Sequence, residues 1–186
     1  MSEASYLAGR LLLAMPGMGD PRFHHAVIAM CLHDAQGALG IGIGHTRNDI
    51  GFHGLLEHLG IDRGKAPDCA VHHGGPVEPG RGFILHSQDW DSEETIKVGS
   101  LCSFSASVEI LEAITAGEGP AQWLIALGYT GWGPGQLDGE MQRHGWFAAE
   151  GRQEILFHTR AQKRWTQTWK AEGIEPALLA STTGSA

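Results

Sequence analysis

Glycine is the feature that most restricts how this chain can fold. Of the 186 residues, 27 are glycine, about twice the usual share of ~7%. The glycines follow no fixed period and come without an excess of proline or serine, so neither a collagen-like helix nor a flexible linker is indicated. In a globular chain, glycine is needed at tight turns and where one backbone approaches another closely. We therefore expect a turn-rich fold with closely packed backbones.

The segment from Ala38 to Gly44 shows this need most clearly. Leu39, Ile41 and Ile43 alternate with glycines, so a strand here would have one apolar face and one face almost without side chains. We expect another part of the molecule to lie close against the bare face.

Composition places the chain among globular proteins. Hydrophobic residues make up 42% of it and charged residues 18%, against roughly 25% charged in an average domain. A chain of this length can bury enough surface for one core without a disulfide or a structural metal. The signals of ordered structure end after Glu175, which predicts one domain over residues 1–175 and a flexible tail over 176–186.

Charge and cysteine spacing exclude several classes of protein. The net charge of −8 opposes direct binding to the phosphate backbone of nucleic acid. Cys31, Cys69 and Cys102 are odd in number and far apart, which fits reduced thiols in the cytoplasm better than a disulfide framework or a zinc ribbon. No apolar run approaches the ~18 to 20 residues needed to span a bilayer. We therefore predict a cytoplasmic protein that binds neither DNA nor membrane.

The hydrophobic pattern predicts an α+β domain. Strand signals come in a consecutive group instead of alternating strictly with helices, which argues against a doubly wound sheet. Glycines inside strands mark bulges and bends, so we expect a mixed, strongly curved, partly barrel-like sheet flanked by helices. The expected strands cover 11–15, 26–32, 38–44, 69–73, 82–86, 95–98, 101–105, 123–127 and 155–157, and the expected helices cover 55–59, 107–117, 135–144 and 161–172.

No recognised catalytic or metal-binding motif is present. The chain lacks a G-x-S-x-G elbow, a P-loop and an H-E-x-x-H helix. Ser87 follows His86 directly, but neighbours on a strand point to opposite faces and cannot pair as nucleophile and base. The eleven histidines show no ligand spacing. We therefore predict no catalytic residue, no cofactor and no metal.

Polar side chains next to glycine-rich turns are the candidates for a binding site. His73 begins the run H-G-G-P-V, His86 ends a strand, and Trp132, Gln136 and Glu140 belong to the run G-Y-T-G-W-G-P-G-Q-L-D-G-E. We hypothesise that these segments meet and that their polar side chains, His73 included, line a shared depression. Trp132 would be its wall, and His86, Gln136 and Glu140 its hydrogen-bonding groups. In the alternative interpretation, the glycines serve turns after Leu127 and Trp132 closes the core.

The same segments carry a resemblance to a known family. Together with L-A-M-P at 13–16 and G-A-L-G at 37–40, they resemble the YqgE/AlgH family of uncharacterised bacterial proteins, from about residue 7 to about residue 173. The resemblance implies a single α+β domain with a rolled, partly barrel-like sheet flanked by helices. It implies no established reaction. One member gave the family an association with the regulation of alginate synthesis, and hence the label of transcriptional regulator.

One segment departs from the family pattern. Many members carry L-V-I-N-R-P after the G-A-x-G turn, whereas this chain has Ile41-Gly42-Ile43-Gly44-His45-Thr46. The Asn, Arg and Pro are missing, so any role that they have in the family cannot be transferred to this chain.

Two functional hypotheses follow. The first is a non-enzymatic regulatory or interaction protein with an unknown protein or small-molecule partner, because no catalytic constellation is found. The second is a small-molecule-binding protein or an enzyme that uses a cleft near His86, Trp132 and Gln136. A bound small molecule beside Trp132 would favour the second hypothesis, and an exposed apolar patch would favour the first.

Overall fold

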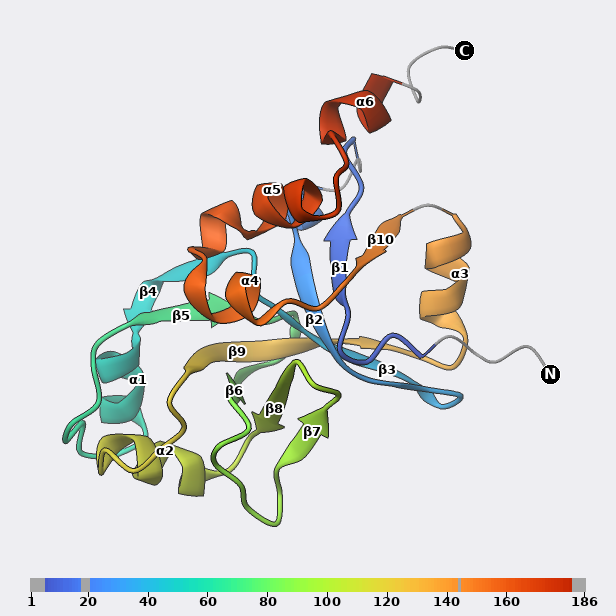
Figure 1. Ribbon diagram of the computed structural model, residues 1–186. Helices are drawn as coiled ribbons and strands as arrows, with labels where there is room; N and C mark the ends of the chain where they lie inside the picture. The colour runs from blue at the N-terminus through green and yellow to red at the C-terminus, as the bar shows by residue number, and fades with distance from the viewer. Residues whose placement is uncertain (1–5, 18–20, 144, 182–186) are drawn as a thin grey trace.

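One ten-stranded sheet organises the molecule (Figure 1). The computed structural model describes residues 6–17, 21–143 and 145–181. The strands are β1 (Leu11–Ala14), β2 (Val27–Asp34), β3 (Gly37–Gly42), β4 (Thr46–Gly51), β5 (Ala70–His73), β6 (Val77–His86), β7 (Ile96–Val98), β8 (Cys102–Ser105), β9 (Trp123–Trp132) and β10 (Trp146–Ala149). The helices are α1 (Phe52–His58), α2 (Val108–Thr115), α3 (Gln136–Gln142), α4 (Gln153–His158), α5 (Ala161–Ala171) and α6 (Pro176–Ser181), with a short 3-10 helix at Pro21–Phe23.

Strand β9 is the centre of the sheet. The order along the sheet is β10-β1-β2-β3-β9-β6-β8-β7, and β5 pairs with both β4 and β9. On the edge of β9 away from β6, the first half of β9 pairs in parallel with β5 and the last three residues pair antiparallel with β3. The ends of β3 and β5 therefore meet beside β9, where the Gly42 N–H donates to the Gly74 carbonyl at 2.7 Å.

Bulges and glycines curve this sheet. The register shifts between Met30 and Leu32 in β2 and between Val77 and Gly82 in β6. A Cβ added to Gly42 would lie 2.6 Å from the His73 carbonyl oxygen, and one added to Gly44 would lie 2.9 Å from a backbone nitrogen and a backbone oxygen. The expected close approach to the bare face of this segment is therefore confirmed.

Both faces of the sheet are covered. Leu11 and Leu13 point into the main core, where Trp165 and Trp169 of α5 pack, while Leu12 between them belongs to a second cluster beside α3. A third cluster packs α1 and α2 against β5, β6 and β9. Figure 1 shows α4 and α5 together on one side of the sheet, and α1 and α2 beside the start of β9.

The single α+β domain with a curled, mixed sheet is confirmed, and several of its elements differ from expectation. Residues 155–157 belong to helix α4, not to a strand, because a short apolar run has no period that separates the two structures. The segment after Leu127 continues as strand β9 to Trp132 before the turn begins. Strands β4 and β10 were not expected, since their residues show no clear alternation.

The end of the chain also differs from expectation. The predicted tail begins with helix α6 over Pro176–Ser181, and residues 182–186 lie outside the described residues. In the described part of the chain, no helix has the length and apolar character needed to cross a membrane.

Candidate functional site

Three of the five predicted site residues meet at the end of β9. Trp132 ends the strand, and Gln136 and Glu140 lie one turn apart on α3. One carboxylate oxygen of Glu140 accepts the indole N–H of Trp132 at 2.9 Å and that of Trp146 at 3.1 Å. Gln136 accepts the Gly133 N–H at 3.0 Å and donates to the other Glu140 oxygen at 3.3 Å. This network fixes α3 against the sheet.

A cavity of about 430 Å³ opens beside this network. We call it the α3 cavity, and its lining residues are Phe23, Pro76, Thr130, Gly131, Trp132, Gln136, Glu140, Arg143, Gly145 and Trp146. Since Trp132 is only 7% exposed, it contributes a wall and little accessible surface. Trp132 thus serves packing as well as the cavity, which combines the two sequence interpretations.

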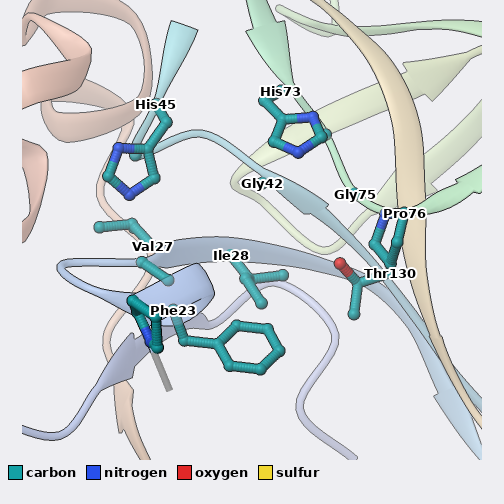
Figure 2. A pocket seen from close by; sticks show the side chains of 13 residues that line it. Phe23, Val27, Ile28, Gly42, His45, His73, Gly75, Pro76 and Thr130 are labelled. Carbon is teal, nitrogen blue, oxygen red and sulfur yellow. The ribbon is translucent and has the colours of Figure 1, made fainter. Parts of the chain in front are cut away.

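His73 lies in a neighbouring cavity of about 400 Å³, at the junction of β3 and β5. We call this the glycine cavity. It is lined by Pro21, Phe23, Ala26, Val27, Ile28, Gly42, Gly44, His45, His73, Gly74, Gly75, Pro76 and Thr130. Figure 2 shows the imidazole rings of His45 and His73 on one side and the side chains of Phe23 and Ile28 on the other. Phe23, Pro76 and Thr130 line both cavities, so the two are adjacent.

Backbone contacts hold the glycine cavity open. Gly75 has φ +155°, and a Cβ there would collide with the backbone of Tyr129. Gly74 donates to the Leu127 carbonyl at 2.9 Å while its own carbonyl accepts from Gly42. Because the wall formed by Gly42, Gly74 and Gly75 is backbone held by these contacts, this part of the cavity is preformed.

Few polar groups face the glycine cavity. The Nε2–H of His45 donates to the His24 carbonyl at 2.8 Å, which leaves Nδ1 as the ring nitrogen that this bond does not use. His73 is exposed and Thr130 is half-buried. Nearby, burial together with the charges of His24 and His45 lowers the pKa of His25. The cavity is therefore an apolar space with two imidazoles and one hydroxyl at its boundary.

The structure does not bring His86 to this region. His86 pairs with Trp123 at the start of β9, whereas Trp132 ends the same ten-residue strand. The His86 ring is fully buried, with Nδ1–H donating to the Ser87 carbonyl and Nε2 accepting from the Ser105 hydroxyl, both at 2.8 Å. Burial lowers the pKa of His86. The expectation that His86 lines the same depression is wrong, because the long strand β9 carries the two ends apart.

Sequence reasoning missed several lining residues. Phe23 comes from a short 3-10 helix that was not expected. His45 follows the strand expected over 38–44, and Thr130 stands in the segment that we interpreted as a turn. The one available signal was the departure from the family pattern at Ile41–Thr46, since Gly42, Gly44 and His45 from that segment all line the glycine cavity. Among the described residues, no group of three or more His, Cys, Asp or Glu side chains is placed to hold a metal ion.

Comparison with known proteins places this architecture in a family. The AlgH-like family model matches residues 11–177. The chain belongs to the AlgH-like family. It is similar along its whole length to a UPF0301 protein of Novosphingobium aromaticivorans, 66% identical over 186 residues, and to one of Rhizorhabdus wittichii, 52% identical over 186 residues; each match covers 100% of both chains.

Solved structures of AlgH-like and more distant proteins share the fold. The solution structure of the AlgH protein from Pseudomonas aeruginosa is 33% identical, with a TM-score of 0.81 covering 100% of this chain and 99% of that one. A crystal structure of a protein from Corynebacterium diphtheriae is 19% identical, with a TM-score of 0.72 covering 92% and 90%. The AlgH-like fold therefore persists at identities where most side chains differ.

Proposed function

We propose that this AlgH-like protein is a non-enzymatic binding protein that takes a small, mainly apolar molecule in the glycine cavity. The observation that carries the proposal is a preformed cavity of about 400 Å³ whose wall is backbone from Gly42, Gly74 and Gly75. Small-molecule sites usually measure ≈ 300–1,000 Å³, with apolar walls and a few polar groups that fix orientation.

The lining determines the class of ligand. The floor is hydrocarbon from Phe23, Val27 and Ile28, while His45 and His73 offer hydrogen bonds at one side (Figure 2). A ligand with an apolar body and one or two polar groups complements this arrangement. A longer ligand extends past Phe23 into the α3 cavity, which brings Trp132 and Gln136 into the site.

The lining also favours binding over catalysis. Among the described residues that line the glycine cavity, none carries a carboxylate, thiol or amine, and none is a serine. The closest arrangement to a nucleophile with its base is Ser105 with His86, and both side chains are fully buried away from this cavity. The regulatory or interaction role then consists of passing ligand occupancy to a partner.

A regulatory role through a partner agrees with the charge of the chain. With a net charge of −8, the protein is poorly suited to contact DNA directly, so the family label of transcriptional regulator is best explained by an indirect effect. The three cysteines are free, which supports action in the reducing cytoplasm.

Binding of a neutral apolar dye tests the proposal. N-phenyl-1-naphthylamine fluoresces more strongly in apolar surroundings, and we expect a saturable increase with one dye per chain. Thr130→Trp fills the space between the two cavities and should weaken binding by at least about tenfold, or 1.4 kcal/mol.

The matched control is Ile96→Trp, an exposed strand position outside both cavities. This variant should bind the dye like the unchanged protein. Unsaturable binding, or equal binding by Thr130→Trp and Ile96→Trp, would show that the dye adheres elsewhere and would reject the proposal.

A further inference from the structure

Arg164 of α5 is a buried cation without a counter-ion. It is 5% exposed, and its guanidinium donates to the carbonyls of Ile43 (2.7 Å), Ile155 (3.0 Å) and Leu156 (2.8 Å). Its fourth partner is Nε2 of His72 at 2.7 Å. No carboxylate of the described residues forms an ion pair with it, and one N–H of Nη2 has no partner within the described chain. A buried charge normally needs a charged partner or a complete set of hydrogen bonds.

His72 cannot neutralise this charge. Its Nδ1–H donates to the Ile125 carbonyl at 3.0 Å, so Nε2 is the acceptor for Arg164 and the ring is neutral. Burial, and then the charge of Arg164, lower the pKa of His72 to about 4. Burial also lowers the pKa of Arg164, to about 10, so the guanidinium stays charged at neutral pH.

A cavity of about 280 Å³ reaches Arg164 from the surface. We call it the arginine cavity, and it is lined by Thr46, Cys69, Ala70, His72, Trp123, Leu124, Leu156, Phe157, Thr159, Arg160, Ala161, Gln162 and Arg164. No acidic residue is among them. Arg160, an exposed second cation, precedes α5, whose first turn contains no acidic side chain. The positive end of the α5 dipole therefore adds to the charge of the two arginines.

We propose that the arginine cavity binds a small oxyanion, as a free phosphate or as the phosphate or carboxylate group of a metabolite. Guanidinium groups recognise such anions through short, charge-assisted hydrogen bonds. Arg160 supplies the accessible cation at the mouth, and Arg164 supplies the buried charge that the anion compensates. The hydroxyl of Thr46 is available as a further donor, whereas that of Thr159 donates to the Glu154 carbonyl at 3.1 Å.

This oxyanion site is separate from the glycine cavity. The two share no lining residue. Neighbouring residues in the sequence line different cavities. His73 and His45 line the glycine cavity, whereas His72 and Thr46, which are next to them in the chain, line the arginine cavity. Failure of either proposal therefore leaves the other intact.

Calorimetric titration with inorganic phosphate, at constant ionic strength set with chloride, tests the proposal. The unchanged protein should bind phosphate saturably at one site per chain. Arg160→Gln should weaken binding by about tenfold or more, because the variant loses a charge-assisted hydrogen bond to the anion. Within the described chain, the hydrogen bond of Arg160 is the one that its backbone carbonyl accepts from the Lys163 N–H, so the variant should keep the midpoint of thermal unfolding measured without phosphate.

Lys163→Gln is the matched control, because Lys163 is exposed on the same helix, carries the same charge and does not line the cavity. This variant should bind phosphate like the unchanged protein. Acetate binding in competition with phosphate would support the site and identify carboxylates as ligands. Absence of saturable binding by both anions, or equal weakening in Arg160→Gln and Lys163→Gln, would overturn the proposal.

Discussion

Residues of similar appearance in the sequence have different roles here, because the role depends on where each side chain is placed. His73 and His86 both end strands, yet His73 is exposed at a cavity and His86 is enclosed. Strand register and pairing decide this difference, and neither can be derived from one sequence. Trp132, Gln136 and Glu140 were predicted together because α3 follows β9 after a short turn, so their proximity is local.

The Trp132 network leads to a prediction about stability. Trp132→Ala should lower the free energy of unfolding by about 3–5 kcal/mol, since a large buried ring is removed. Gln136 is exposed, so Gln136→Ala should change it by no more than about 1 kcal/mol. Urea unfolding of both variants measures this. A large loss from Gln136→Ala would mean that Gln136 serves the fold and not a binding surface.

His72 should make the protein less stable in mild acid. Its pKa is about 4 in the folded protein, against an ordinary value of 6.5, so the unfolded chain takes up the proton first. The contribution of His72 to the free energy of unfolding is therefore fully present above pH 6.5, and it is lost as the pH decreases towards 4. Between pH 6.5 and 5 this loss is about 2 kcal/mol.

His72→Gln tests this dependence, because glutamine keeps an acceptor for Arg164 without titrating. Urea unfolding at pH 7 and pH 5 should show a smaller loss in the variant than in the unchanged protein. If both proteins lose the same free energy, His72 is not the titrating group.

At the scale of elements, the β3–β5 junction is the feature that the sequence could not reveal. The bare glycine face of β3 predicted a close backbone neighbour, but not that this neighbour would be the end of β5. Long-range pairing of this kind leaves no local pattern. Helix α4 was missed because a short apolar run fits a strand and a helix equally. Its support by Arg164 of α5, which donates to the carbonyls of Ile155 and Leu156, also leaves no pattern in residues 155–157.

The junction predicts different costs for two glycine substitutions. Gly75→Ala should destabilise the protein by about 3 kcal/mol or more, because the added methyl group meets the Tyr129 backbone at a positive φ. Gly80→Ala in β6 is the control, since a Cβ there meets nothing within 4 Å, and it should change stability by no more than about 1 kcal/mol. Thermal and urea unfolding compare them. Equal costs would mean that the junction is less tightly packed than described.

At the scale of the whole molecule, composition gave a sound outline. Glycines within strands predicted a curved sheet, and bulges in β2 and β6 are part of that curvature. The covering of both sheet faces was only partly foreseeable, because the alternation of Leu11, Leu12 and Leu13 between two clusters depends on where α3 and α5 dock.

The overall charge predicts the behaviour towards DNA. With a net charge of −8, the protein should not bind duplex DNA more tightly than non-specific levels at physiological salt. A gel-shift titration measures this. Sequence-dependent retardation at sub-micromolar protein would show that a local surface overrides the overall charge.

The central claim is that the cavity at the β3–β5 junction receives the ligand, and NMR of the ¹⁵N-labelled protein tests it most directly. On titration with N-phenyl-1-naphthylamine, we predict the largest amide shifts at Gly42, Gly74, Gly75 and Thr130, which line the glycine cavity. Shifts concentrated at Leu59 and Val108, which are exposed apolar residues at another hollow of the surface, would contradict the claim.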